Sequence, residues 1–337
     1  MDSRAEAGKA VLKYRTIRDP RIVGYAFRKG TTTVNAPERR DEETQDGCSL
    51  EQALRFLPGP GTSRKLKVER IPNGRTNRVY KVEKDGKPCI LRISGANTKV
   101  LGLNRPFERD VMRAAARLGV GPGVEVANLR KGVFVFEFLP GLHPGFAQMH
   151  DPAVLTRVVE ALRRVHTIPL RRVRFCPFQK AEEWYQGALR HGVRFPGIYQ
   201  AVHAQMQKHR KTLESLPALP PRLCHNDAVR PNLLLDDDAV RLVDWEYAAL
   251  GDPVFDLTVL CMNNGLSPEE EKSLLEQYLG KRDASAILRL RILKLAFDFH
   301  LWVWYLAQPT VVTSKGDLEH GIQHHYTRLT RNLQTLP

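Results

Sequence analysis

The residues whose types and spacing could do chemistry lie between His225 and Asp244. His225-Asn226-Asp227 is followed five positions later by Asn232, and Asp244 comes twelve positions after that asparagine. In such a set, one carboxylate can accept the proton of a substrate hydroxyl, while an amide oxygen and a second carboxylate hold Mg²⁺ against phosphate groups. Mg²⁺ takes hard oxygen ligands and keeps several of its waters, so two protein ligands suffice. The spacing suits phosphoryl transfer, with Asp227 as general base and Asn232 and Asp244 as metal ligands.

Short β elements must position these side chains. The leucines at 233–235, a turn of three aspartates at 236–238 and the run VRLVDWE at 240–246 predict a hairpin inserted among helices. This hairpin would place Asp227 and Asn232 on the preceding loop and Asp244 at the end of the second strand. An isolated His-x-Asp is usually only a hydrogen-bonded turn. With Asn232, Asp244 and Asp256 in register, we favour the catalytic interpretation.

The rest of the chain predicts two lobes. Strand-like runs alternate with turns from 66 to 139, interrupted by a helix expected over 105–118, and the signals from Pro152 onward are chiefly helical. Ahead of the strands, Ser49 and Gln52 form a capping box for a short helix. The fold class is therefore predicted to be α+β with a two-lobed, kinase-like plan. Its parts would be a poorly structured or accessory arm over 1–46, a small β-rich N-lobe over 47–138 and a larger, mainly helical C-lobe over 139–337.

Composition and charge exclude several classes of protein. The 337 residues are 42% hydrophobic and 26% charged, which excludes disordered, collagenous and fibrous proteins. The sequence shows no signal peptide, no apolar span long enough for a bilayer and no CxxC pair among its five cysteines. These features predict reduced thiols, no membrane insertion and a cytoplasmic location.

The net charge of +15 is typical of proteins that bind nucleic acid or acidic membranes. However, the first 60 residues hold 11 Lys and Arg against 9 Asp and Glu, so the surplus does not form a basic tail. The basic run RRVHTIPLRRVRF at 163–175 lacks the interleaved aromatic residues of a nucleic-acid platform. We therefore expect no nucleic-acid partner, and a basic surround that favours the approach of anionic MgATP.

The string LCHNDAVRPNLLLDDDAVRLVDWEYAALGDPVFDL at 223–257 resembles the signature of the choline/ethanolamine kinase family. That family lies within the aminoglycoside phosphotransferase-like group, which shares the protein-kinase-like fold, and the resemblance runs from Leu66 to the C-terminus. It implies that Asp227 is the base and that Asp256 supports the catalytic loop. It also implies that His225 organises this loop and does not transfer a proton in the reaction, and that Asn232 and Asp244 bind Mg²⁺.

The resemblance also implies nucleotide contacts in the N-lobe. The turn at 73–77, which contains Gly74, Thr76 and Asn77, corresponds to the family's phosphate-covering turn. Arg92 stands where protein kinases keep a lysine that binds phosphate, and Glu108 on the next helix is its expected ion-pair partner. The connector between the lobes, whose backbone would bond the adenine of ATP, is expected at Glu137, Phe138 and Leu139.

The acceptor pocket is expected in the C-terminal helices. Choline is a quaternary ammonium, so its selective binding needs aromatic faces and a nearby negative field. The segment DFHLWVWYLAQ at 298–308 and Tyr326 resemble the family's closing helices, which implies that Trp304 and Tyr326 wall the cation. Trp302 is a third candidate, although it lies about 200° around the helix from Trp304. Without the resemblance, all three would be ordinary core aromatics. The negative charge would come from Glu246, Asp252 and Asp256.

The sequence thus predicts an ATP- and Mg²⁺-dependent kinase that phosphorylates the hydroxyl of a small amino alcohol, with choline as the first candidate. The chain departs from the eukaryotic members after Asp256, so ethanolamine, thiamine and aminoglycosides stay open as acceptors. A non-catalytic nucleotide- or nucleic-acid-binding protein on the same scaffold is the alternative from another class. His320 and His324 have the spacing of a metal pair but no third ligand, which favours a solvated helix face. The oligomeric state is left open.

Overall fold

The computed structural model describes residues 48–59, 65–72, 77–95, 102–236, 239–307 and 315–334. The expected N-terminal arm over 1–46 lies outside the described residues. The same is true of Gly74 and Thr76 in the expected phosphate-covering turn.

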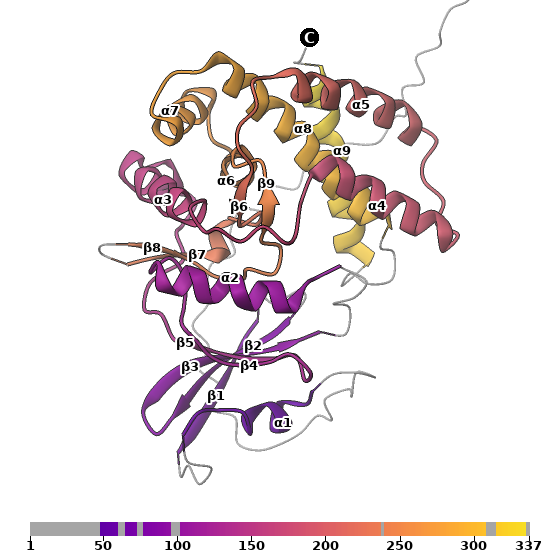
Figure 1. Cartoon of the computed structure of the whole chain (residues 1–337). Helices are drawn as coiled ribbons and strands as arrows, with labels where there is room; N and C mark the ends of the chain where they lie inside the picture. Colours follow the sequence, from indigo (N-terminus) through magenta and orange to yellow (C-terminus); the bar gives the residue numbers. More distant parts are fainter. Residues whose placement is uncertain are drawn as a thin grey trace, which may run out of the picture. The chain divides into compact units, whose positions relative to one another are not determined.

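A five-stranded antiparallel sheet forms the N-terminal lobe (Figure 1). Its strands follow the spatial order β1-β2-β3-β5-β4. Asp85 and Gly86 both have positive φ and join β2 to β3, as expected for a two-residue hairpin turn. Strand β4 was not predicted, because its five residues directly follow a Gly-Pro-Gly turn and form only a short run. The bounds are β1 (Leu66–Ile71), β2 (Asn77–Lys84), β3 (Lys87–Ser94), β4 (Val124–Asn128) and β5 (Val133–Glu137).

Two helices pack against this sheet. Helix α1 (Leu50–Leu54) begins at the predicted capping box, in which Ser49 and Gln52 bond each other's backbone N–H groups. Helix α2 (Arg105–Arg117) is capped by the Asn104 side chain, and Gly119, with φ of 65°, follows its end. The apolar face of α2 joins the main core together with residues of β5 and of the C-terminal helices. Figure 1 shows α2 between the sheet and these helices.

The C-terminal lobe is mainly helical, which confirms the predicted two-lobed α+β plan. Two small antiparallel sheets interrupt the helices, one pairing β6 with β9 and the other pairing β7 with β8. The β7–β8 hairpin was predicted, whereas β6, β9 and helix α6 were not. The helices are α3 (Pro152–Val165), α4 (Pro177–Arg190), α5 (Tyr199–Ser215), α6 (Val254–Asn264), α7 (Pro268–Leu279), α8 (Ala284–Ala307) and α9 (Lys315–Leu333). The short elements are the 3-10 helices η2 (Ala147–His150) and η3 (Arg230–Asn232), with β6 (Arg222–Cys224), β7 (Leu233–Leu235), β8 (Val240–Leu242) and β9 (Ala249–Gly251).

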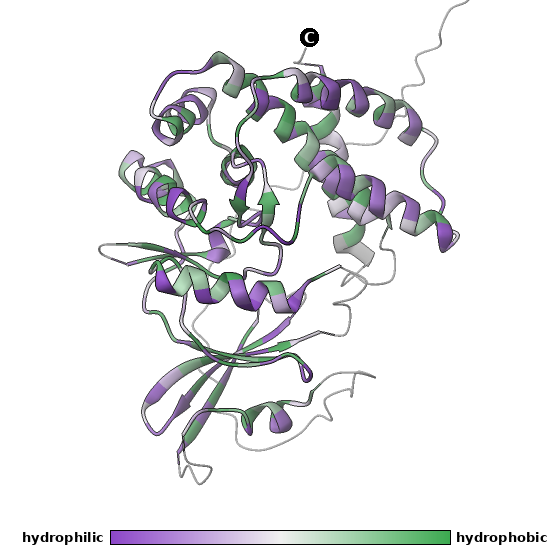
Figure 2. Cartoon of the chain, in the orientation of Figure 1, coloured by the Kyte–Doolittle hydropathy of each residue, from purple (hydrophilic) through white to green (hydrophobic). Residues whose placement is uncertain are grey.

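Helices α6 and α8 form the centre of the C-terminal lobe. Both are rich in hydrophobic residues, whereas α5 is largely hydrophilic (Figure 2). Side chains on most of the circumference of α8 are buried, since α4, α6 and α9 all pack against it. Among the described residues, no helix has the length and apolar character that a bilayer span requires. All five cysteines are free thiols, as predicted.

Candidate active site

Asp227 and Asn232 lie together on the loop that connects β6 to β7. Asn232, the last residue of η3, donates from Nδ2 to the carbonyl oxygen and to Oδ2 of Asp227, each at 2.9 Å. Its Oδ1 accepts no hydrogen bond from the described part of the chain. The amide therefore orients the expected base and keeps its own oxygen available for a cation.

The carboxyl of Asp227 sits in an environment that disfavours its charged form. Burial raises its pKa well above the ordinary value, and the negative charges of Asp244 and Glu246 add to this effect. The hydrogen bond from Asn232 opposes the rise. A carboxylate with a raised pKa is a stronger base once it is deprotonated, which suits the acceptance of a hydroxyl proton.

Asp244 lies two residues beyond the end of β8, on a loop. The prediction that it ends the second strand is therefore wrong: β8 ends at Leu242, and Asp244 has a left-handed backbone with φ of 62°. Its Oδ1 lies 3.3 Å from Arg92 Nη1. Although 37% of its side chain is exposed, desolvation and the nearby Glu246 raise the pKa of Asp244 to about 7, against the opposing effect of Arg92. The loop thus presents a carboxylate near Arg92.

His225 contacts the backbone of the expected catalytic loop with one ring nitrogen and that of Val243 with the other. Its Nδ1 accepts from the backbone N–H of Asp227 at 3.3 Å, and its Nε2 lies 3.0 Å from the carbonyl oxygen of Val243. Burial lowers the pKa of His225, although Asp256 and the Val243 carbonyl oppose the shift. A neutral ring with Nε2–H satisfies both contacts. This geometry agrees with the expected organising role.

Asp256, in the first turn of α6, holds the backbone of the same loop. Its two carboxylate oxygens accept from the N–H groups of His225 at 2.8 Å and Asn226 at 2.6 Å, and the side chain is fully buried. Asn226 has φ of 63°, which is uncommon for a residue other than glycine. The two hydrogen bonds that Asp256 accepts stabilise this conformation and so fix the backbone that leads into Asp227.

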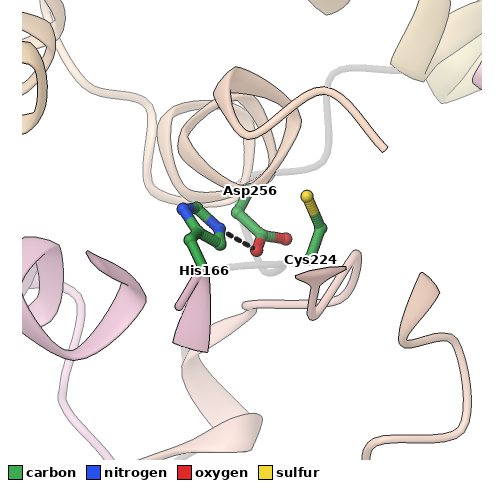
Figure 3. Close-up of side chains that lie close together, drawn as sticks. All are labelled: His166, Cys224 and Asp256. Atoms are coloured by element: carbon green, nitrogen blue, oxygen red, sulfur yellow. Dashed lines mark hydrogen bonds and ion pairs between the residues drawn. The ribbon is translucent and has the colours of Figure 1, made fainter. Parts of the chain in front are cut away.

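His166, at the end of α3, contacts the carboxylate of Asp256 (Figure 3). The His166 Nε2 lies 2.9 Å from Asp256 Oδ2, and its Nδ1 lies 2.7 Å from the hydroxyl of Tyr278. Burial alone would raise the pKa of Asp256, but the hydrogen bond and charge of His166, together with His225, hold it below the ordinary value. The sequence analysis did not single out His166 or Tyr278, because one histidine at a helix end is not a distinctive signal.

His166, Asp256 and Cys224 lie close enough together to suggest a metal site (Figure 3). However, protein groups already occupy both ring nitrogens of His166. Burial, assisted by Asp256, raises the pKa of the Cys224 thiol well above its usual value, whereas a metal ligand must be a thiolate. We interpret this buried trio as a structural support of the catalytic loop.

Arg92 on β3 forms the predicted ion pair with Glu108 on α2. Its Nη1 lies 2.6 Å from Glu108 Oε1, and its guanidinium stacks over the ring of Phe134, 4.6 Å from the centroid. The other two guanidinium nitrogens, Nε and Nη2, are buried and have no hydrogen-bond partner among the described residues. Buried donors normally have partners. These two are therefore suited to phosphate oxygens, as the sequence analysis expected.

Arg105, which the sequence analysis missed, connects the two lobes beside this pair. It lies 2.8 Å from Glu108 and 3.0 Å from Glu246, and it donates to Asn77 Oδ1 at 2.9 Å. One signal in the sequence pointed to it. A cation at the first position of a helix is disfavoured by the helix dipole. Contacts with other parts of the fold must therefore stabilise Arg105 at this position.

Two of the carboxylates expected to attract a cationic acceptor have other partners. Glu246 is buried and bonded by Arg105 and by Asn77 Nδ2. Asp252 pairs with Arg289 at 2.5 Å, and its Oδ1 accepts from the N–H of Val254 in α6. Each of the two carboxylates thus has an arginine partner, and the expectation that they supply negative charge to the acceptor pocket stays a prediction. Asp256, the third, is fully buried within the loop support.

The three aromatic candidates do not form one cage. Tyr326 lies against Trp302, with ring centroids 5.3 Å apart, and the Trp302 ring also lies 5.9 Å from that of Tyr199. Trp302 is 1% exposed and belongs to the hydrophobic core between α4, α5 and α8, which overturns its candidacy as an acceptor contact. Trp304 is partly buried, and its ring contacts Tyr305 instead of Tyr326. Trp304 and Tyr326 are thus not brought together as the expected pair.

Tyr247, on the loop after Glu246, is an aromatic residue near the carboxylates that the sequence analysis did not select. Burial, with Glu246, Asp227 and Asp244, raises the pKa of its phenol well above the usual value. Its carbonyl oxygen accepts from Asn226 Nδ2 at 2.9 Å, so the catalytic loop fixes its backbone. The sequence offered one signal for Tyr247, because it is the last residue of the motif Asp-Trp-Glu-Tyr, which also contains the candidates Asp244 and Glu246.

The expected connector follows β5. Glu137 is the last residue of the strand; its N–H bonds the carbonyl oxygen of Gly123, and its carboxylate accepts from the Gly123 N–H. The backbone N–H of Glu137 is therefore already used. Phe138, whose ring lies 4.4 Å from Lys81 Nζ, and Leu139 lie beyond the strand, where backbone groups could bond an adenine.

Known proteins resemble this chain in sequence and in fold. The phosphotransferase enzyme family matches residues 67–291. Protein LicA of Haemophilus influenzae is 27% identical over 260 residues, which are 74% of this chain and 73% of LicA. A choline/ethanolamine kinase family protein from Mesorhizobium loti has a similar crystal structure, with a TM-score of 0.69 and 25% identity over 84% of this chain and 97% of that one. Choline kinase LicA from Streptococcus pneumoniae has a similar fold, with a TM-score of 0.69 and 21% identity over 80% of this chain and 94% of that one. The kinase-like fold and the resemblance seen in the sequence are confirmed.

Proposed function

The chain belongs to the phosphotransferase enzyme family, and we propose that it transfers the γ-phosphoryl group of ATP to the hydroxyl of a small amino alcohol, with choline as the first candidate. The family and the choline and ethanolamine kinases among the similar proteins make it a phosphotransferase that acts on an alcohol group. The finer assignment of donor, metal and acceptor is our proposal. The observation that carries it is the convergence of Asp227, Asp244 and Arg92 on one site.

Asp227 is the proposed general base. The Asn232 amide holds its Oδ2, which leaves the other carboxylate oxygen to accept the proton of the substrate hydroxyl. Orientation of the base and the hydroxyl removes much of the entropy cost of the reaction. The attacking oxygen then bonds to the γ-phosphorus as the bond to the β-phosphate oxygen breaks, and ADP leaves.

The donor set fits Mg²⁺ and phosphate. Asn232 Oδ1 and the Asp244 carboxylate would hold the ion, and both are the hard oxygen ligands that Mg²⁺ prefers. When bound, Mg²⁺ supplies positive charge that neutralises the phosphates. The two unpartnered nitrogens of Arg92 would bond phosphate oxygens, and the Arg92–Glu108 ion pair keeps the guanidinium in place for this role. Phe138 and Leu139 follow as the proposed adenine contacts.

A cationic acceptor is supported by the charges nearest the base. Glu246 and Asp252 each pair with an arginine, and Asp244 is assigned to Mg²⁺, so we assign Asp227 as the carboxylate that faces the acceptor's ammonium. The aromatic faces would come from Tyr247, which lies among the site carboxylates, and from Trp304, which is not enclosed in the core. A quaternary ammonium binds such faces through cation–π attraction. The cytoplasmic location expected from the sequence is part of the same proposal.

A screen of acceptors tests the assignment. Purified protein with ATP and Mg²⁺ is offered choline, ethanolamine, thiamine or an aminoglycoside, and ADP release is followed by a coupled assay. We expect choline to give the highest kcat/KM and EDTA to abolish turnover. Faster turnover of ethanolamine or thiamine would overturn the choice of choline while keeping the mechanism. Faster turnover of an aminoglycoside would overturn the amino-alcohol class.

A further inference from the structure

A buried polar cluster joins the two lobes next to the proposed phosphate site. Arg105 contacts Glu108 and Glu246 through Nη1 and Asn77 through Nη2, at 2.8 to 3.0 Å. Asn77 Nδ2 in turn donates to Glu246 Oε2 at 2.8 Å, which closes the cluster. All four side chains are buried, with at most 7% of each residue exposed.

Each partner of Arg105 adjoins a residue assigned to the phosphates. Asn77 is the last residue of the expected phosphate-covering turn and the first residue of β2. Glu108 holds Arg92 with its other carboxylate oxygen. Glu246 lies two positions after Asp244, on the same loop. Arg105 thus bonds side chains on β2, on α2 itself and on the loop that carries Asp244.

Arg105 supplies one of the two positive charges that face the buried carboxylates of this cluster. Arg92 and Arg105 face two buried carboxylates, Glu108 and Glu246. Removal of one partner from a buried ion pair leaves an uncompensated charge, which is costly away from water. Arg105 also occupies the first helical position of α2, where the dipole disfavours a cation. The three contacts explain why an arginine stands at this position, since the helix itself does not favour one there.

We propose that Arg105 is a positioning residue for phosphoryl transfer. Through Asn77 it holds the start of β2, through Glu108 it holds the Arg92 guanidinium, and through Glu246 it holds the loop of Asp244. The two lobes thereby keep the register that the triphosphate needs. A lysine would retain the charge, but its single ammonium lacks the planar fork that reaches acceptors on three elements. This inference rests on the proposed use of ATP at this site.

Kinetics of Arg105 variants test the proposal. Arg105→Met and Arg105→Lys are compared with Arg113→Met, a control at an exposed position of the same helix. We expect Arg105→Met to lower kcat at least tenfold and to raise KM for ATP at least fivefold, with KM for the acceptor changed less than twofold. Arg105→Lys should recover part of the loss, and Arg113→Met should behave as the wild type. A folded Arg105→Met variant with wild-type kcat and KM for ATP would overturn the proposal.

Nucleotide binding separates this inference from the choice of acceptor. The dissociation constant of the Mg²⁺ complex of a fluorescent N-methylanthraniloyl-ATP needs no acceptor, and Arg105→Met should raise it at least fivefold. An unchanged constant would overturn the role of Arg105 even if choline is phosphorylated. A raised constant would support it even if choline is inert. If the wild type does not bind the probe, both proposals fail. Should Arg105→Met not fold, Asn77→Ala is used instead, and it must raise the same constant.

Discussion

Asn232 donates from Nδ2 to Oδ2 of Asp227 at 2.9 Å, so one amide orients the proposed base and offers its own oxygen to the proposed Mg²⁺ site. The two roles are linked through a single side chain. Loss of this amide should therefore disturb both proton transfer and metal binding, which is unusual for a neutral residue.

Asn232→Ala tests this link. The hydrogen bond stabilises the charged form of Asp227 and lowers its pKa, so its loss should raise that pKa further. The acid limb of the kcat/KM profile should then move to higher pH, and the Mg²⁺ concentration for half-maximal activity should rise. Both are measured by steady-state assays between pH 5 and pH 9, with Asn128→Ala as the control. An unshifted profile would contradict the orientation of Asp227 by Asn232.

Arg92→Lys tests the phosphate clamp. Lysine keeps the positive charge near Glu108 and Asp244 but loses the planar fork whose Nε and Nη2 are unpartnered among the described residues. We expect KM for ATP to rise about tenfold, which corresponds to about 1.4 kcal/mol, while KM for the acceptor stays unchanged. Arg78→Lys on the neighbouring strand is the control. Equal effects on both KM values would place Arg92 outside the nucleotide site.

Asp256→Asn tests the support of the catalytic loop through its pH dependence. The folded-state pKa of Asp256 lies below its ordinary value, so its carboxylate contributes stability at pH above the unfolded pKa of about 4, and this contribution is lost as pH falls through the folded pKa. The variant should be about 1–3 kcal/mol less stable at pH 7. Urea unfolding should show this difference shrinking below about pH 4. A difference that does not shrink at low pH would contradict the assignment.

Trp302→Ala should chiefly lower the stability of the protein, whereas Trp304→Ala should chiefly weaken the binding of choline. Trp302 is buried against Tyr199 and Tyr326, so truncation should lower the free energy of unfolding by about 3–5 kcal/mol. Trp304→Ala should change stability far less and should raise KM for choline. Thermal melts and acceptor titrations measure the two effects. If Trp304→Ala leaves KM for choline unchanged, the aromatic wall must come from Tyr247 alone.

The sequence predicted the parts of the site that local spacing determines. Asp227 and Asn232 are five positions apart on one loop, and Arg92 and Glu108 occupy a strand and the helix that follows it, so simple patterns place both pairs. The partners of Glu246 were not predictable in this way. Arg105 and Asn77 lie 141 and 169 positions from Glu246 in the chain, and only the packing of the two lobes brings them together.

The burial of Trp302 was not predictable for a related reason. The period of helix α8 shows that Trp302 and Trp304 point in different directions, but it does not show which direction faces the core. Helices α4 and α5 cover the side that carries Trp302, and α9 brings Tyr326 to it. His166 was missed because its partners, Asp256 and Tyr278, come from two other helices.

The most direct test of the account is a product analysis with the wild type and Asp227→Asn. ATP, Mg²⁺ and choline are incubated with each protein, and ³¹P NMR follows the phosphorus species. The wild type should form one phosphocholine for each ADP, and Asp227→Asn should bind ATP normally but react about 10²- to 10⁴-fold more slowly. Phosphocholine formation by Asp227→Asn at the wild-type rate would contradict the proposed mechanism.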